Sequence, residues 1–401
     1  MNIIKGGVTA PIGFSASGVA CGIKKDGSRD VALVCSDSLC AVSGVFTKNV
    51  VKGHSLLMTM EHASRNSAKA IVINSGNANA CVGEQGKADA IAVASLTAEL
   101  LNCKPHEVLF NSTGVIGQPL NIKALKSGIK TAIDSLSNSG GHDAAQAILT
   151  TDTVTKEFAV ETETNGIKVR VGGMAKGSGM IHPNMATMIG VITTDINITQ
   201  TLMDMAFKEA VNLSFNRISV DGDTSVCDMV VLLSNKAAGN GVIDDKDSQG
   251  YASFKKALGM VCDYLAKAIV KDGEGATKLV EIIVDGAKTQ HDAEKILYAV
   301  AKSPLVKTAI FGEDANWGRI ITAAGYSGAI FNPNFIDIYI GGLKVCSNGA
   351  AIAFNEEKAK KILSQKEITI RINLNEGGFS DKILTCDLSY DYIKINGSYR
   401  S

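Results

Sequence analysis

Thr187 is the strongest candidate for covalent chemistry in this sequence. It follows the small residue Ala186, after a glycine-rich polar approach, and precedes the apolar run 188–192. If the Ala186–Thr187 bond breaks, Thr187 gains a free α-amine with a pKa of about 7.7–8.0. That amine can take the proton from its own residue's hydroxyl, so one residue supplies nucleophile and base. By pattern alone, a threonine that simply begins an interior strand is the favoured interpretation.

A threonine that transfers acyl groups also needs donors for the oxyanion of its tetrahedral intermediate. Thr113 and Gly114 offer a hydroxyl and an open backbone N–H, on an expected loop after a short strand. Losing one such donor typically costs about 3–4 kcal/mol of transition-state stabilisation. A capped turn that opens the next helix explains these residues at least as well. His182 competes as the base, but its odd offset from Thr187 puts the two side chains on opposite faces of an extended segment.

Four glycine-rich loops adjoin apolar segments, where backbone N–H groups can approach a ligand. Each loop is also explained by turn geometry, which is the favoured interpretation for any one of them. None has the spacing of a phosphate-binding loop, so we expect no nucleotide site. The loops are SGNANAC (75–81), STGVIG (112–117), AKGSGM (175–180) and DGEGATK (272–278).

Composition favours a small-molecule partner. The 401 residues carry 40 basic and 40 acidic side chains, so no excess charge suggests nucleic acid or an anionic membrane as partner. No apolar run is long enough to span a bilayer, and the first residues lack the continuous apolar core of a signal peptide. The nine cysteines and six histidines are dispersed without metal-ligand spacing. We therefore expect neither metal nor disulfides, and a reducing cytoplasm.

Helical and strand patterns alternate along the chain, which indicates an α/β architecture of layered sheets and helices. A polar stretch at 235–253 is a weak candidate for a domain boundary, although composition shows no clean division. The patterns predict strands at 70–74, 108–110, 229–233, 280–284 and 368–372, and helices at 85–101, 121–136, 199–213 and 253–270.

The run KGSGMIHPNMATMIGVITTD (176–195) resembles the self-cleavage segment of the ornithine acetyltransferase family, the bifunctional glutamate N-acetyltransferases and amino-acid acetyltransferases. Other matches to this family follow in order over nearly the whole chain. They are SGVFTKN (43–49), NSGNANAC (74–81), NSTGVIG (111–117), TTDT (150–153), SVDGDTSVCD (219–228), KDGEGATK (271–278), IFGEDANWGR (310–319) and NGSYRS (396–401).

The resemblance implies a layered α/β sandwich that cuts itself between Ala186 and Thr187. An α chain (1–186) and a β chain (187–401) would stay together, build one site jointly and assemble as an α2β2 heterotetramer. Thr187 would take acetyl from N-acetylornithine, release ornithine and pass the acetyl to glutamate, which gives N-acetylglutamate in arginine biosynthesis. No cofactor is implied. The sequence leaves open whether acetyl-CoA is also a donor.

The resemblance also assigns site residues. Thr113 and Gly114 match the family's oxyanion hole, and the substrate-contacting positions are Thr153, Lys176, Thr187, Glu274, Asn396 and Ser401. Among these, Glu274 suits a substrate ammonium and Lys176 suits a carboxylate or carbonyl oxygen. The chain departs from the family pattern at Thr155 and Ala315, which stand where proline is usual, and at Ser401, where threonine is common.

Two other functions fit parts of the pattern. A related self-cleaving hydrolase, such as an aminopeptidase or amidase, would share the threonine and the oxyanion hole but transfer the acyl group to water. The matches at Lys176, Glu274 and the C-terminus argue against it. A catalytically silent metabolite-binding protein of the same fold would leave the chain uncut.

Overall fold

The computed structural model describes residues 1–182 and 188–398. By their internal packing these residues form two compact units. The first unit contains residues 1–182, 188–216 and 223–269, and the second contains residues 217–222 and 270–398.

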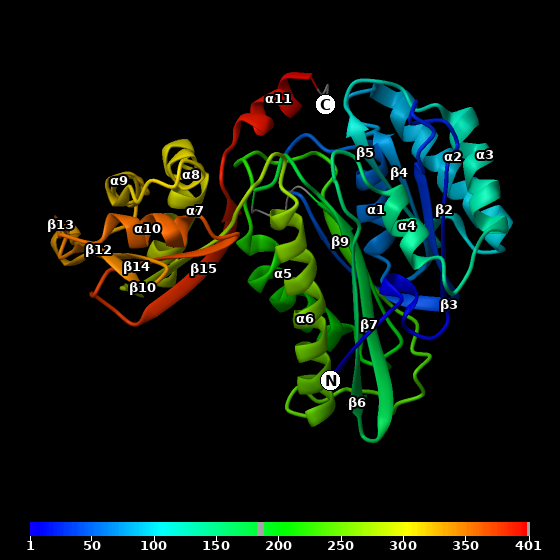
Figure 1. Cartoon of the computed structure of the whole chain (residues 1–401). Helices are drawn as coiled ribbons and strands as arrows, with labels where there is room; N and C mark the ends of the chain where they lie inside the picture. The colour runs from blue at the N-terminus through cyan, green and yellow to red at the C-terminus, as the bar shows by residue number, and fades with distance from the viewer. Residues whose placement is uncertain (183–187, 399–401) are drawn as a thin grey trace. The chain divides into compact units, whose positions relative to one another are not determined.

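The first unit is built on a nine-stranded mixed sheet (Figure 1). Its strand order is β1-β6-β7-β8-β9-β3-β4-β5, and β2 pairs with β3. The strands are β1 (Asn2–Ile4), β2 (Phe14–Val19), β3 (Val31–Phe46), β4 (Ala68–Asn77), β5 (Val108–Val115), β6 (Lys156–Thr164), β7 (Ile167–Lys176), β8 (Ile189–Thr194) and β9 (Met229–Ser234). The helices are α1 (His54–Ala63), α2 (Gly83–Leu101), α3 (Ile122–Asp134), α4 (Gly141–Ala147), α5 (Gln200–Leu213) and α6 (Gln249–Lys271).

Alternation of side chains along β4 creates two cores on opposite faces of the sheet. Ala70 and Val72 join one core with α2 and α3, which lie together beside β4 and β5 in Figure 1. Ile71 and Ile73 join another core with α1, α4, β8 and β9. The continuous apolar run at 70–73 therefore belongs to a strand that is buried on both faces.

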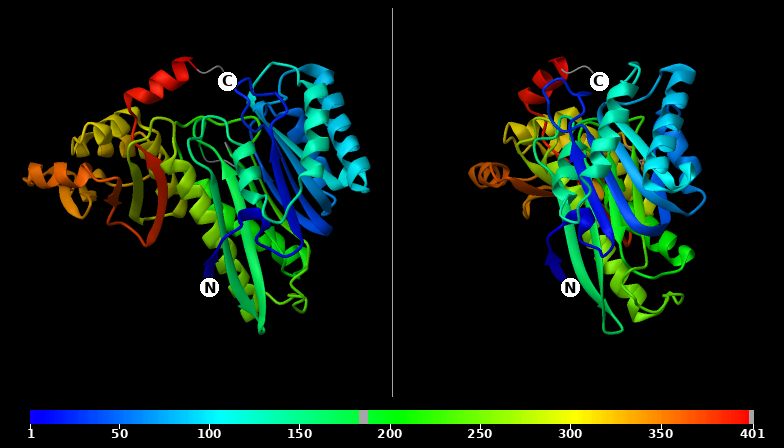
Figure 2. Two further views of the ribbon diagram at one scale, coloured as in Figure 1. Left: turned by 45° about the vertical axis from the view of Figure 1, so that its right-hand side comes forward. Right: turned by 90° about the vertical axis from the view of Figure 1, so that its right-hand side faces the viewer.

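The part of the sheet formed by β6 and β7 is covered by α6. Phe158 of β6 stacks on Tyr264 of α6, with ring centroids 4.1 Å apart. Figures 1 and 2 show α6 running along these strands. The first unit therefore alternates helical layers with sheet, as the α/β interpretation predicts.

The second unit has its own six-stranded sheet, in the order β13-β12-β11-β14-β10-β15, and its own apolar core. Its strands are β10 (Leu279–Ala287), β11 (Asp337–Ile340), β12 (Leu343–Ser347), β13 (Ala350–Ala351), β14 (Glu367–Asn373) and β15 (Phe379–Cys386). Its helices are α7 (Gln290–Lys302), α8 (Pro304–Phe311), α9 (Trp317–Gly325), α10 (Glu356–Leu363) and α11 (Tyr390–Ser398). Short 3-10 turns lie at Gly7–Thr9, Pro105–Glu107, Phe215–Arg217 and Pro333–Phe335.

Each strand and helix predicted from the sequence is present, with ends shifted by a few residues. The boundary prediction at 235–253 is wrong, because this stretch lies within the first unit. Asn240 ties it there: its side chain accepts from the backbone N–H of Asn197 at 2.9 Å and donates to the carbonyl of Asn197 at 3.0 Å. Among the described residues, no helix has the length and apolar character needed to cross a membrane.

Candidate active site

Thr113 and Gly114 lie in the last residues of β5, where this strand pairs in parallel with β4. Thr113 is opposite Ser75 and Gly114 is opposite Gly76, and the register shifts immediately afterwards. The prediction of a loop is therefore wrong, because the strand continues through both residues. The alternative of a capped turn is also wrong, since α3 begins at Ile122 and is capped by the side chain of Asn121.

Gly114 occupies a position that accepts no side chain. Its φ is +131°, and a Cβ built there would lie 2.4 Å from the carbonyl carbon of Gly76 and 2.6 Å from the backbone nitrogen of Asn77. These are backbone atoms of the paired strand and cannot move aside independently. Glycine at this position is what allows the two strand ends to approach each other.

Replacing Gly114 by alanine is therefore expected to lower the free energy of unfolding by about 2 kcal/mol or more, from the unfavourable φ and the clash together. Gly117→Ala is the matched control, because Gly117 also has positive φ (+77°) but a Cβ there would meet nothing within 4 Å. Thermal unfolding of both variants checks the prediction. Equal melting temperatures would show that the strand ends are not closely packed.

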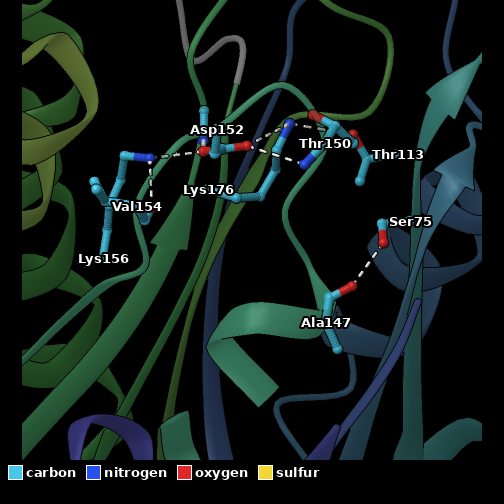
Figure 3. Close-up of polar contacts among 9 residues, drawn as sticks. Ser75, Thr113, Ala147, Thr150, Asp152, Val154, Lys156 and Lys176 are labelled. Atoms are coloured by element: carbon cyan, nitrogen blue, oxygen red, sulfur yellow. Dashed lines mark hydrogen bonds and ion pairs between the residues drawn. The ribbon is translucent and has the colours of Figure 1, made fainter. Parts of the chain in front are cut away.

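Lys176 is the last residue of β7 and contacts Thr113 directly (Figure 3). Its Nζ donates to the Oγ1 of Thr113 at 3.5 Å, and both residues are buried. An ammonium group has no acceptor, so the oxygen of Thr113 must be the acceptor in this contact. The hydroxyl hydrogen of Thr113 is then left to donate to another group, as an oxyanion donor must.

Asp152 connects the segment before β6 to the end of β7. Its side chain is fully enclosed and accepts from the Nζ of Lys156 at 2.7 Å and from the backbone N–H of Gly177 at 2.6 Å. The Nζ of Lys176 lies 4.0 Å from its other oxygen (Figure 3). Asp152 is not among the site residues predicted from the sequence; its only signal there is its place in the TTDT motif.

Electrostatics keeps Asp152 ionised. Burial alone would raise the pKa of this carboxyl, but the ammonium groups of Lys176 and Lys156, with the hydrogen bonds from Lys156 and Gly177, lower the pKa to about 2. An ionised carboxylate therefore faces Lys176 throughout the neutral pH range.

Lys24 adds a further positive charge that the sequence analysis also missed. Burial lowers the pKa of its ammonium, and the charge of Lys176 lowers it further, whereas nearby carboxylates, Asp152 among them, oppose the shift. Its Nζ donates to the carbonyl of Arg29 at 2.8 Å. No spacing rule in the sequence relates Lys24 to residues more than a hundred positions later.

The strand that follows Thr187 is aligned with Lys176. Ile189, the first residue of β8, pairs with Lys176, and the carbonyl of Met188 accepts the N–H of Met229 at 3.0 Å. Thr187 and Ala186 themselves lie outside the described residues. Thr153 follows Asp152 and is exposed, and His182 is half-buried.

In the second unit, the structure brings Glu274 and Asn396 together. Glu274 is buried in the turn after α6, and its Oε2 accepts from the side-chain amide of Asn396, on α11, at 2.7 Å. The turn has no room for a side chain at Gly275, where a Cβ would lie 2.4 Å from the backbone nitrogen of Tyr392. Ser401, the other C-terminal candidate, lies outside the described residues.

The Glu274 turn is fixed by residues that the sequence analysis did not identify. The carboxylate of Asp387 accepts from the backbone N–H groups of Thr277 and Lys278, at 2.8 and 2.9 Å. The hydroxyl of Ser389 donates to the carbonyl of Gly275 at 2.5 Å. Within residues 1–182 and 188–398, no three His, Cys, Asp or Glu side chains are grouped as ligands for a metal ion.

Known proteins are similar to this chain over nearly its whole length. A model of the ArgJ family matches residues 15–401. Relatives named arginine biosynthesis bifunctional protein ArgJ, from Caldanaerobacter subterraneus subsp. tengcongensis and Symbiobacterium thermophilum, are each 49% identical to this chain, and each match covers 100% of both sequences. A crystal structure of ornithine acetyltransferase complexed with ornithine, from Mycobacterium tuberculosis, is 39% identical; the match covers 46% of this chain and 98% of that chain, with a TM-score of 0.43. Since the family model and both relatives align over nearly the entire sequence, this chain belongs to the ArgJ family.

Proposed function

We propose that this protein is a glutamate N-acetyltransferase of arginine biosynthesis, which moves acetyl from N-acetylornithine to glutamate. The observation that carries the proposal is the match of residues 15–401 to the ArgJ family, with relatives of the arginine pathway identical at 49% of positions. Ornithine leaves after the first half-reaction, and N-acetylglutamate forms in the second. The acetyl group is held between the two half-reactions as an ester of Thr187.

The nucleophile is made by cleavage of the chain between Ala186 and Thr187. The products are an α chain of residues 1–186 and a β chain of residues 187–401, which assemble as α2β2. The new α-amine of Thr187 then acts as the base for its own hydroxyl. The hydroxyl of Thr113 and the backbone N–H of Gly114 stabilise the oxyanion. The contact between Lys176 and Thr113 supports this role, because it leaves the hydroxyl hydrogen available to donate.

Substrate recognition needs groups of opposite charge for the ends of an amino acid. Glu274 binds the substrate ammonium, with Asn396 as its neutral neighbour, and Lys176 binds a carboxylate or carbonyl oxygen. Thr153 and Ser401 complete the contacts through their hydroxyls. The 2.7 Å hydrogen bond from Asn396 to Glu274 supports this assignment, because it orients one carboxylate oxygen.

Glu274→Gln should lower kcat/KM for N-acetylornithine by roughly tenfold to a hundredfold, since a hydrogen bond to a charged group contributes about 1.5–3 kcal/mol. Glutamine retains an oxygen that can accept from Asn396, so the variant removes mainly the charge. Steady-state kinetics of purified protein checks this. Glu281→Gln is the control, because Glu281 pairs with the exposed Lys382 at 3.0 Å; an equal loss in both variants would exclude a specific role for Glu274.

The transferase is separated from a hydrolase by one assay. Ornithine release from N-acetylornithine is measured with and without glutamate; a transferase requires glutamate for continuous release. Equal rates in both reactions would favour a hydrolase.

A second assay tests whether acetyl-CoA is also a donor for this chain, since the relatives are named bifunctional. It measures formation of N-acetylglutamate from acetyl-CoA and glutamate in the absence of N-acetylornithine.

A further inference from the structure

Asp152 is a charged group beside Lys176, and the proposed mechanism gives it no role. Its side chain has no solvent exposure. It accepts from the backbone N–H of Thr150 at 3.1 Å as well as from Lys156 and Gly177. These contacts fix the carboxylate on three sides, and Lys176 faces it from the direction of Thr113 (Figure 3).

The position of Lys176 depends on this carboxylate. The side chain of Lys176 has rotational freedom along four carbons, and holding it in one rotamer has an entropic cost. On one side its Nζ lies 4.0 Å from Asp152, and on the other it donates to Thr113 at 3.5 Å. Of these two contacts, only the one with the Asp152 carboxylate is an attraction between opposite charges. Without that carboxylate, the ammonium of Lys176 would not be held at the position from which it donates to Thr113.

We propose that Asp152 is a positioning residue for acetyl transfer: through Lys176 it holds the hydroxyl of Thr113 in the orientation that donates to the oxyanion. The inference rests on the proposed function, because it concerns the same transition state. It adds a residue to the site that does not contact substrate. It also explains why a carboxylate is buried here with two lysines rather than one.

A purely structural role for Asp152 makes a different prediction. Its shortest contact with a charged group is with Lys156, whose side chain is also fully enclosed. If this pair served only the fold, loss of the carboxylate would lower stability and leave the kinetics of the folded protein unchanged. Kinetic constants and melting temperature must therefore be measured together.

The first variant is Asp152→Asn, which keeps an oxygen for the N–H of Gly177 and removes the charge. We expect kcat for transfer from N-acetylornithine to glutamate to fall by roughly tenfold to a hundredfold. This decrease is smaller than the roughly 10²–10³-fold decrease that follows the loss of an oxyanion donor itself. KM should change less than kcat. Asp195→Asn is the matched control. Asp195 is a buried carboxylate in the same unit, and it accepts from the backbone N–H groups of Ile12 and Arg170. It lies near the ends of β7 and β8 that are opposite to Lys176. The kcat of Asp195→Asn should therefore equal that of the wild type.

A double-mutant cycle with Lys176→Met tests the pathway of the effect. If Asp152 acts through Lys176, Asp152→Asn should lower kcat no further in the Lys176→Met background. The full loss in that background, or a wild-type kcat for Asp152→Asn alone, would overturn the inference. A wild-type protein that transfers no acetyl would instead contradict the proposed function, and the inference with it.

A second variant covers the case in which Asp152→Asn does not fold. Asp152→Leu combined with Lys156→Met replaces both charges of the buried pair with apolar side chains, which is often tolerated. The ammonium of Lys176 then no longer faces the carboxylate of Asp152, and position 156 has no unpaired charge. A folded double variant with wild-type kcat would contradict the inference, and one whose kcat is lower than that of the wild type by roughly tenfold to a hundredfold would support it.

Discussion

Thr187→Ala is expected to leave a single uncut polypeptide with no measurable acetyl transfer. Alanine lacks the hydroxyl that attacks the preceding carbonyl during cleavage and the acetyl group during catalysis. The uncut chain also lacks the free α-amine that serves as the base. Denaturing electrophoresis and an assay of ornithine release measure the two losses on one preparation.

Thr187→Ser is the control for this result, because serine keeps the hydroxyl and loses only a methyl group. It should retain some cleavage and some transfer. Cleavage of the alanine variant at the same bond would rule out self-cleavage by this residue. Normal transfer by an uncut alanine variant would rule out Thr187 as the nucleophile.

Thr113→Val should lower kcat by roughly 10²–10³-fold, which corresponds to the loss of one oxyanion donor, or about 3–4 kcal/mol. Valine has the β-branched shape of threonine, so the strand should form as before. The KM for N-acetylornithine should change much less than kcat, since the oxyanion exists only near the transition state. Steady-state kinetics over a range of N-acetylornithine concentrations separates the two constants.

Thr59→Val is the matched control for Thr113. Thr59 is a buried threonine on α1 whose hydroxyl donates to the carbonyl of Phe110 at 2.6 Å and accepts the N–H of the same residue at 2.7 Å. Loss of the Thr59 hydroxyl should lower the melting temperature, because two buried backbone groups of β5 lose their hydrogen-bond partner. The kcat of Thr59→Val should stay close to that of the wild type. A similar loss of kcat in both variants would mean that β5 has been disturbed as a whole.

Local patterns in the sequence predicted the local structure well. The apolar run at 70–73 reads as a buried strand, and β4 is buried on both faces. The helix predicted at 85–101 corresponds to α2, whose small residues pack on β4 and β5. These elements follow from side-chain periodicity, which a single sequence contains in full.

Thr113 marks the limit of such reasoning. The polar, glycine-containing run after 110 favours a loop, but β5 continues to Val115 because Gly76 and Gly114 let two strand ends meet closely. That pairing joins residues nearly forty positions apart, so no local pattern contains it. Tertiary pairing overrides local preference here.

Long-range charge pairing was equally hidden from the sequence. Asp152 and Lys176 are separated by a complete β-hairpin, β6 and β7, whose register brings Lys156 opposite Ala175. Only that register makes a shared ion-pair group of Asp152, Lys156 and Lys176. The family resemblance supplied Lys176 as a candidate, but it did not indicate what holds its side chain.

The division into units could not be predicted either. The chain leaves the first unit after residue 216, returns at 223 and leaves again after 269, within α6. Composition reveals a domain boundary only where the linker is polar, and these positions have no polar linker. The stretch 235–253 is polar because it is a surface excursion, and its contacts with Asn197 keep it in the first unit.

The most direct test of acetyl transfer through Thr187 is mass spectrometry of the protein after incubation with N-acetylornithine alone. We expect a polypeptide that begins at Thr187 and has gained the mass of one acetyl group on that residue. We also expect this added mass to disappear when glutamate is supplied and N-acetylglutamate forms. Continued transfer to glutamate by a protein that never acquires this acetyl group would rule out an acetyl ester of Thr187 as the intermediate.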